Sequence, residues 1–397
     1  MDRSKLKVRK CVVGVEKKMN ILITGGAGFI GSHLALKLSD RGYGVTVFDN
    51  LSPQVHGADP EKTSPLYQSI MGKVNFIKGS VVSRLDWKKV LVGQDVVIHL
   101  AAETGTGQSM YEIEKYASVN IGGTALLLDI LTNNEHKIKK VIVASSRAIY
   151  GEGKYNCSKH GSIFPLARRE TDMSKGEFEC KCPKCGNRVQ LCATDESSKI
   201  HPTSIYGITK QNQEQMVMMI CPMIGITGIA FRYQNVYGPG QSLQNPYTGI
   251  LSIFSTRLMS NKPINIFEDG MESRDFVYID DVVNATIAGI EYESFDSLSI
   301  NVGTGASVTV SMVAEKLKKL YHSNSEVYIS GNYRLGDIRH NNADISLLRK
   351  ILRYNPTIDF DDGIVKFVNW VKEHETTDSV FSYERSLAEM KSRGLYK

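Results

Sequence analysis

A glycine-rich turn between a short apolar run and a helical pattern is the feature that most constrains the fold. Residues 20–24 are apolar and lead into Gly25-Gly26-Ala27-Gly28-Phe29-Ile30-Gly31, after which Ile30, Leu34 and Leu38 recur on one helical face. A strand that passes through a Gly-x-x-Gly-x-x-Gly turn into a helix is the loop that holds a dinucleotide pyrophosphate. The helix N-terminus supplies amide donors and a favourable dipole for the phosphates. We therefore predict a parallel, nucleotide-binding α/β sheet.

The same alternation of apolar runs and helical patterns continues along the chain. The predicted later strands are residues 45–49, 74–77, 96–100, 141–146 and 226–231. The predicted helices are residues 29–39, 117–133, 203–220 and 311–321. This rhythm is typical of α/β proteins with a doubly wound parallel sheet, the Rossmann architecture.

An acidic residue at the end of the second predicted strand indicates which dinucleotide the loop binds. Asp49 closes residues 45–49, and no arginine follows immediately in Asn50, Leu51 and Ser52. A carboxylate here accepts hydrogen bonds from the ribose hydroxyls and repels the 2′-phosphate of NADP. We therefore expect NAD as the cofactor.

A Tyr-x-x-x-Lys motif on the predicted helix 203–220 indicates hydride-transfer chemistry. Tyr206 and Lys210 are four residues apart and share a helix face. A free phenol with a pKa of about 10 is a poor base at neutral pH, and a neighbouring ammonium favours the phenolate. Ser146, at the end of the fifth predicted strand, is the candidate hydroxyl that bridges substrate and tyrosine, and Ser145 is the alternative.

Composition excludes several other classes of protein. The 397 residues carry a net charge of +6, with 42% hydrophobic residues. So small an excess of positive charge does not by itself indicate a nucleic-acid partner. We expect no membrane span because no apolar run approaches about 18 residues. The first eighteen residues lack a secretory signal and five of the seven cysteines cluster between residues 157 and 192, so we expect a cytoplasmic protein.

These motifs, together with six further blocks, resemble the extended short-chain dehydrogenase/reductases, in particular the nucleotide-sugar epimerase/dehydratase family. The similarity runs from about residue 20 to about residue 370. The further blocks are residues 97–102, 120–124, 145–151, 231–239, 273–282 and 334–340. The resemblance implies an NAD-dependent isomerase that acts on a nucleotide sugar. The resemblance also suggests a homodimer that forms through helices near 108–133 and 203–220. Those helices could equally be buried within a monomer.

The resemblance assigns roles to individual residues. Ser146, Tyr206 and Lys210 would form the catalytic triad. The candidate cofactor-binding residues are Gly25, Gly28, Phe29, Ile30, Gly31, Asp49, Asn50, Leu100, Ala101, Ala102, Asn120, Tyr206 and Lys210. The candidate substrate-binding residues are Asn235, Arg274, Arg334 and Asp337. The two arginines suit a diphosphate because a guanidinium pairs bidentately with its oxygens.

One departure from the family pattern favours one reaction within it. The family's 4,6-dehydratases carry Asp-Glu directly after the catalytic hydroxyl, as the acid and base for loss of water. Arg147 and Ala148 stand there in this chain. Without those carboxylates we expect epimerisation, which needs only hydride removal, rotation of the keto sugar and hydride return.

The chain divides into two unequal lobes around an insert. We expect residues 1–18 to be a disordered extension and residues 19–235 to form the NAD-binding Rossmann domain. Residues 236–397 would form a smaller α+β lobe for the nucleotide sugar, with about 275–302 returning to the Rossmann domain. Residues 152–198, polar and without clear periodicity, read as an inserted subdomain.

The insert carries two pairs of metal-ligating residues. Cys157-x-x-His160 and Cys182-x-x-Cys185 are four ligands of the kind that hold a tetrahedral, structural zinc. Cys180 and Cys192 are spare candidates. The alternatives are reduced, unliganded cysteines, or a zinc ribbon for nucleic acid, which the balancing acids of the insert disfavour.

Within the family, the insert together with residues 245–249 and 266–270 looks most like dTDP-L-rhamnose 4-epimerases. That resemblance implies interconversion of dTDP-L-rhamnose and dTDP-6-deoxy-L-talose, and a place in deoxysugar and polysaccharide biosynthesis. The alternatives are a 4-epimerase for UDP-hexoses, a nucleotide-sugar reductase, and a non-catalytic NAD-binding sensor whose zinc ribbon contacts partners.

Overall fold

The computed structural model describes residues 19–245, 247, 249–374 and 379–397, with the backbone alone for 379–382. The extension predicted for residues 1–18 lies outside this range. Within it, the predicted strands and helices of the Rossmann pattern are present to within three residues at each end. The predicted helix 117–133 begins as a π-helical turn, Ala117–Gly122, and continues as α8, Gly123–Asn133.

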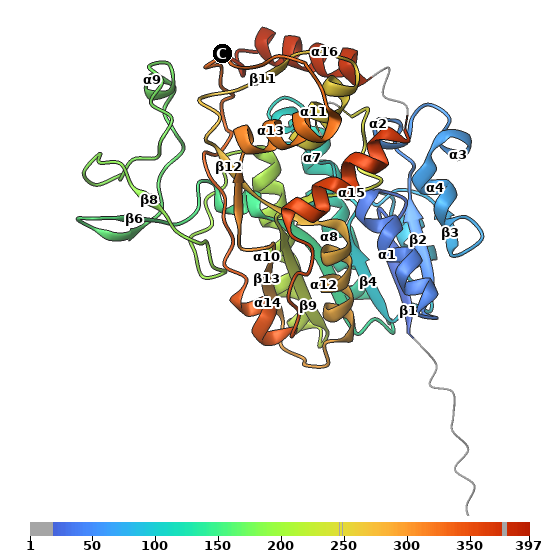
Figure 1. Cartoon of the computed structure of the whole chain (residues 1–397). Helices are drawn as coiled ribbons and strands as arrows, with labels where there is room; N and C mark the ends of the chain where they lie inside the picture. The colour runs from blue at the N-terminus through green and yellow to red at the C-terminus, as the bar shows by residue number, and fades with distance from the viewer. Residues whose placement is uncertain (1–18, 246, 248, 375–378) are drawn as a thin grey trace, which may run out of the picture.

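A seven-stranded sheet in which every neighbouring pair is parallel forms the centre of the molecule (Figure 1). Its strands in spatial order are β13 (Leu298–Val302), β9 (Thr227–Tyr233), β5 (Lys140–Ser146), β4 (Val96–His99), β1 (Asn20–Thr24), β2 (Gly44–Asp49) and β3 (Asn75–Lys78). The order reverses at β1, so the chain is doubly wound about that strand. A ligand crevice is expected beyond the carboxyl ends of the strands at such a point.

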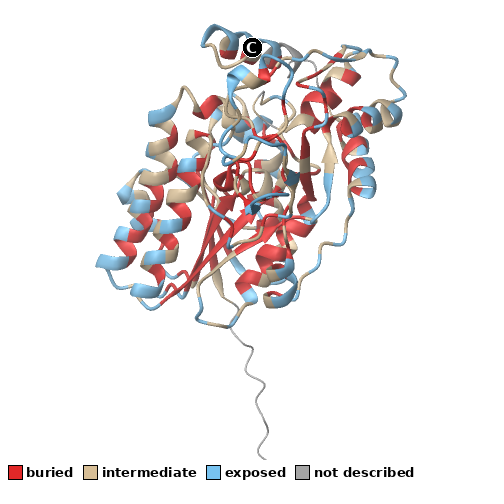
Figure 2. Cartoon of the chain, turned by 90° about the vertical axis from the view of Figure 1, so that its left-hand side faces the viewer, coloured by how far each residue is buried: buried red, intermediate tan, exposed pale blue. Residues whose placement is uncertain are grey.

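Helices cover both faces of this sheet, and Figure 2 shows the buried strands between them. On one face lie α1 (Phe29–Asp40) and α12 (Ile279–Glu291). On the other lie α5 (Arg84–Val90), α8 and α10 (Ile205–Met223). Successive residues of β1 alternate between the two cores, because side chains of a strand point to opposite faces.

The second lobe is built from short strands and helices. Two small sheets combine β10 (Asn235–Tyr237), β12 (Ser273–Tyr278) and β14 (Ser307–Thr309), and β11 (Ile264–Ile266) with β15 (Val327–Ile329). Its longer helices are α11 (Ile250–Met259), α13 (Val310–Tyr321), α15 (Phe360–Lys372) and α16 (Ser379–Ser392). Between these elements the chain returns to the large sheet as α12 and β13.

Short helices and turns complete the described fold. They are α2 (Pro53–His56), α3 (Pro60–Thr63), α4 (Pro65–Ile70), α6 (Thr106–Ser109), α7 (Ile113–Tyr116), η2 (Arg147–Tyr150) and α14 (Ser346–Ile351). None of the helices in the described residues is long and apolar enough to cross a membrane.

The insert leaves the sheet after β5 and projects from the body of the molecule (Figure 1). It contains α9 (Glu170–Met173) and a sheet of β7 (Gly161–Ile163), β6 (Tyr155–Cys157) and β8 (Gln190–Leu191). The two ends of its outer part meet where the Cys192 amide donates to the Lys154 carbonyl (3.0 Å). The insert therefore adds structure without interrupting the large sheet.

Candidate active site

The glycine loop is packed too tightly for side chains at three of its positions, Gly25, Gly26 and Gly31. Gly25 has a φ of +65°, and a Cβ there would lie 2.8 Å from the backbone of Ala101. A Cβ on Gly31 would overlap the Gly25 carbonyl oxygen. The Cβ position of Gly28 meets only the Gly25 carbonyl, at 3.2 Å. The loop is thus packed against the segment that follows β4, whereas the Cβ position of Gly28 has only the Gly25 carbonyl near it.

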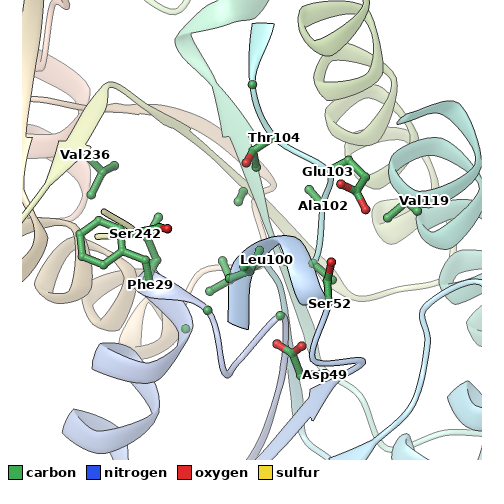
Figure 3. A pocket seen from close by; sticks show the side chains of 18 of the residues that line it. Phe29, Asp49, Ser52, Leu100, Ala102, Glu103, Thr104, Val119, Val236 and Ser242 are labelled. Atoms are coloured by element: carbon green, nitrogen blue, oxygen red, sulfur yellow. The ribbon is translucent and has the colours of Figure 1, made fainter. Parts of the chain in front are cut away.

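A cavity of about 430 Å³ opens beside this loop (Figure 3). Its wall includes these predicted cofactor residues: Gly25, Gly28, Phe29, Ile30, Gly31, Asp49, Asn50, Leu100, Ala101, Ala102, Tyr206 and Lys210. Asp49 stands at the end of β2, where Figure 3 shows its carboxylate below Ser52. Its two oxygens accept from the amides of Ala27 (3.0 Å) and Leu51 (2.9 Å), so the carboxylate also fixes the glycine loop.

Asn120 is the predicted cofactor residue that the structure places behind this wall. Its side chain is fully buried, its Oδ1 accepts from the Glu103 amide (2.8 Å), and its Nδ2 donates to the Thr209 hydroxyl (2.9 Å). Asn120 therefore connects the loop after β4 to α10, the helix that carries Tyr206 and Lys210.

Tyr206 lies where two cavities meet. The first is the cavity beside the glycine loop, and the second extends between the Rossmann domain and the smaller lobe. The residues that line both are Gly105, Tyr206, Tyr247 and Gly249. A group held at Tyr206 is thus accessible from both cavities.

Ser146 and Lys210 both lie beside Tyr206. Burial raises the pKa of Tyr206, while its hydrogen bond with Ser146 and the nearby charge of Arg147 act in the opposite direction. Burial lowers the pKa of Lys210 to about 7. The Lys210 Nζ donates to the Ala144 carbonyl (2.9 Å) and lies 5.9 Å from the centre of the Tyr206 ring. A phenolate beside an ammonium offsets both desolvation effects.

Ser146 and its alternative, Ser145, have different hydrogen-bond partners in the structure. The Ser145 hydroxyl donates to the buried carboxylate of Glu214 (2.5 Å), which also pairs with Arg232. Ser146 caps the turn η2 by accepting from the Ala148 amide (3.1 Å) and is the serine bonded to Tyr206. Ser145 therefore belongs to a structural network behind the site.

The four predicted substrate-binding residues line the second cavity together. They are Asn235, Arg274, Arg334 and Asp337. Arg334 stacks over the ring of Phe267, with its guanidinium carbon 4.9 Å from the ring centre, and its Nε lies 3.3 Å from the Asp337 carboxylate.

Buried polar atoms without hydrogen bonds indicate that the wall of this cavity is a site for a polar molecule, although one of them, Glu272 Oε2, lies 3.8 Å from Arg339 Nη1. Within the described residues, the side-chain oxygens Asn235 Oδ1, Asn265 Oδ1 and Glu272 Oε2 are buried and make no hydrogen bond. Burial raises the pKa of Glu272 to about 7. Since buried polar groups in proteins are normally paired, these oxygens point to a ligand that supplies donors.

Arg147 is a residue of this cavity that sequence reasoning did not place in the site. It lines the wall beside Tyr206, and burial and the charge of Arg274 lower its pKa to about 10. No residue in the described part of the chain forms a hydrogen bond or ion pair with its guanidinium. The sequence signal for Arg147 is its position directly after Ser146.

The four predicted metal ligands of the insert come together in space. The ligand atoms of Cys157, His160, Cys182 and Cys185 all lie within 4.8 Å of one another. His160 Nδ1 is 3.5 Å from the sulfurs of Cys157 and Cys182. Zn–S bonds of about 2.3 Å place tetrahedral sulfurs about 3.8 Å apart. The Sγ atoms of Cys157 and Cys185 are 3.8 Å apart, so the residues fit zinc.

The spare cysteines lie outside this cluster. Cys180 is buried near Tyr155 and Glu152, and burial raises the pKa of its thiol. The Cys192 sulfur makes its hydrogen bond to the Gln190 carbonyl (3.9 Å).

Comparison with known proteins places this site in a family. The model of the NAD-dependent epimerase/dehydratase family matches residues 21–170 and 183–303. The chain belongs to the NAD-dependent epimerase/dehydratase family. It is accordingly an enzyme of this type, and the gap between the two matched parts falls inside the insert.

Relatives of several substrate types lie at comparable distance from this epimerase/dehydratase chain. A dTDP-L-rhamnose 4-epimerase of Burkholderia thailandensis is 33% identical over 89% of this chain and 95% of its own length. The crystal structure of UDP-glucose 4-epimerase of Thermotoga maritima with UDP-glucose is 29% identical, with a TM-score of 0.72 over 89% of this chain and 99% of that chain. A UDP-glucuronic acid 4-epimerase of Bacillus cereus, crystallised with UDP-glucuronic acid and NAD, is 26% identical, with the same TM-score and coverage.

Proposed function

We propose that this enzyme epimerises a nucleotide sugar at C4 through a transient 4-keto intermediate, with retained NAD as its hydride carrier. The observation that carries the proposal is the position of Tyr206 between the cavity at the glycine loop and the cavity lined by Arg274 and Arg334. NAD fits the first cavity because of the open glycine loop and the Asp49 carboxylate. The NAD-bound structure of the Bacillus cereus relative supports the same cofactor.

The chain's own residues supply the proton chemistry. NAD⁺, when bound, accepts a hydride from the sugar and returns it. Tyr206 as phenolate removes the proton of the C4 hydroxyl and gives it back at the end. Ser146, hydrogen-bonded to Tyr206, orients that hydroxyl. Lys210 uses one of its three N–H donors on the Ala144 carbonyl and keeps the others for ligands, while its charge favours the phenolate.

The cationic wall of the second cavity suits the diphosphate that links the sugar to its nucleoside. Arg274 and Arg334 line it with Arg147, and these three guanidinium groups supply the charge-assisted donors that phosphate oxygens accept best. The carboxylates that dehydration requires are missing at Arg147 and Ala148, which supports epimerisation over loss of water.

For the sugar we propose dTDP-L-rhamnose, with dTDP-6-deoxy-L-talose as its C4 epimer. The relative in Burkholderia thailandensis supports this choice. UDP-sugar epimerases are similarly close, so UDP-glucose and UDP-glucuronic acid are the competing substrates.

Proton NMR of the purified protein with dTDP-L-rhamnose, without added cofactor, tests the proposal. Appearance of the C4 epimer supports both the reaction and retained NAD. Conversion of a UDP-sugar instead would identify a different substrate for the same C4 epimerisation. Turnover that requires added NADH would show that the enzyme is a reductase. Tyr206→Phe is the control: its rate falls about 10²- to 10⁴-fold, the range for removal of a general base, while its NAD content stays unchanged.

We also propose that the insert binds one structural zinc ion through Cys157, His160, Cys182 and Cys185. These four residues would supply all four ligands of a tetrahedral ion, as in structural sites, and the insert has only a small core of its own. Metal analysis should give one zinc per chain, and Cys185→Ser should lower that value below one half. A full zinc content in Cys185→Ser would show that these residues are not the ligands.

A homodimer remains a proposal from family resemblance. Helix α10 supports it by exposing three apolar side chains, Ile208, Met219 and Met223. Light scattering on a size-exclusion column measures the mass directly, and a mass of one chain would contradict the proposal.

A further inference from the structure

The insert is connected to the wall of the second cavity by a buried arginine. The Arg168 side chain is 4% exposed, and its Nη1 donates to the Glu268 carboxylate (2.7 Å). Its Nη2 donates to the Asp337 carbonyl (2.9 Å), and its Nε to Glu152 (3.3 Å). Glu268 and Asp337 both line the cavity, so Arg168 of the insert forms hydrogen bonds directly with residues of the cavity wall.

A second connection runs through Glu179. Its Oε1 accepts from Arg339 Nη2 (2.6 Å) and Nε (2.9 Å), and its Oε2 lies 3.3 Å from His340 Nε2. The Arg339 side chain is fully buried and also donates to Glu268 (2.9 Å). Arg339 and Arg168 therefore share Glu268, and the insert contacts one continuous ionic network.

This network holds the segment 334–340, which in turn holds the phosphate-binding candidates. Arg274 donates to the carbonyls of Ile338 (2.8 Å) and Arg339 (3.0 Å). Arg334 and Asp337 belong to the segment itself. A shift of residues 334–340 would therefore move the donors proposed for the diphosphate.

The loop that connects the insert to the ionic network also carries part of the cysteine cluster. Glu179 precedes Cys182 by three residues, and the Cys182 amide donates to the Asn187 carbonyl (2.8 Å) to form the knuckle. The buried core of the insert consists of Tyr155, Ile163 and cysteines of the cluster and beside it. Because so small a core stabilises little by itself, metal ligation would fix the loop that carries Glu179.

We infer that the metal-bound insert is a positioning element of the nucleotide-sugar cavity: ligation at the cysteine cluster holds Glu179, and Glu179 with Arg168 holds segment 334–340 in the geometry that binds a nucleoside diphosphate. This inference rests on the proposed function for the chemistry of the ligand. The glycine loop has no part in the network, so NAD retention is independent of it. Perturbing the network weakens nucleotide-sugar binding and raises KM, with little change in kcat.

Glu179→Gln is the decisive variant, because it removes the only carboxylate of the described insert that pairs with the Arg339 guanidinium, beside Glu268 and Asp269 of the second lobe, and leaves all four metal ligands in place. Glu177→Gln is the matched control: Glu177 lies two residues away in the same loop, is exposed, and pairs with the half-buried Lys181. Isothermal titration with dTDP and UDP gives the Kd, and the absorbance of released NAD gives the cofactor content. We expect Kd to rise about tenfold in Glu179→Gln and to stay unchanged in Glu177→Gln, with equal NAD and zinc content in all proteins.

A double variant shows whether the metal acts through Glu179. Cys185→Ser, or reversible removal of zinc with a chelator where that variant does not fold, should weaken dTDP binding to the same extent as Glu179→Gln. The combination should weaken it no further, because both changes break one connection. Unchanged binding in Glu179→Gln, or losses that multiply in the combination, would overturn the inference. Failure of the wild-type protein to bind either nucleotide would instead count against the proposed function.

Discussion

Arg147 places a positive charge beside the proposed catalytic base at neutral pH. Its guanidinium lies in the second cavity, with no ion-pair partner in the described residues, and its charge lowers the pKa of Tyr206 against the effect of burial. The same cation is available to the diphosphate or to the developing keto oxygen. One side chain can therefore affect both the pH dependence and the binding of substrate.

We predict that Arg147→Gln shifts the acid limb of the kcat/KM profile to higher pH. The reaction requires the phenolate, and removal of the charge raises the Tyr206 pKa, so a smaller fraction of the enzyme is active near neutrality. Initial rates between pH 6 and pH 10 measure the limb. Arg147→Lys keeps the charge and should keep the profile close to wild type. If the acid limb of the kcat/KM profile does not shift in Arg147→Gln, Arg147 does not lower the Tyr206 pKa and acts only in substrate binding.

At the scale of elements, the turn between β1 and α1 requires glycine because neighbouring backbone leaves no room for a Cβ. Gly25→Ala would place a methyl group 2.8 Å from the Ala101 backbone at a φ of +65°. We predict a loss of about 1–3 kcal/mol of stability, the range for overpacking, together with reduced NAD content. Urea unfolding and the absorbance of released NAD measure the two effects.

Gly93→Ala is the matched control for this prediction. Gly93 has a φ of +75°, and no atom lies within 4 Å of its added Cβ. It therefore reports the cost of the backbone conformation alone. Equal losses in both variants would show that the contact with Ala101 contributes nothing.

The elements of the Rossmann half could be predicted from sequence because each depends on local pattern. The strands are apolar runs that end at glycine or at polar residues, and the cysteine pairs have knuckle spacing. The roles of Arg168 and Glu268 could not be predicted. They are far apart in sequence, and their interaction exists only once the insert has packed against the second lobe. The sequence shows Arg147 as a departure from the family pattern. Only the structure shows that its guanidinium has no ion-pair partner in the described residues.

At the scale of the whole molecule, the two lobes are not consecutive units of the chain. Strand β13 comes from beyond residue 290 and pairs with β9 at the edge of the large sheet. A fragment of residues 19–235 would leave the buried strand β9 with unpaired backbone groups and without α12 over one face. Exposed apolar edges of this kind promote aggregation.

We therefore predict that the fragment 19–235 does not fold as an independent NAD-binding domain. Size-exclusion chromatography should show aggregates, and thermal unfolding followed by circular dichroism should lack a cooperative transition, in contrast to the full chain. A monomeric fragment that retains NAD would show that the sheet is stable without its last strand.

The backbone hydrogen bond between Lys154 and Cys192 has a consequence for how such a chain can change. Two points that touch in the folded protein can be rejoined by a short connection, so the segment between them behaves as a cassette. Its removal would spare Glu152, which stays in the body of the protein, and would take away Arg168, Glu179 and all four metal ligands at once. A lineage could gain or lose this cassette in one genetic event, and the surface of the substrate cavity would then have to adapt to its presence or absence.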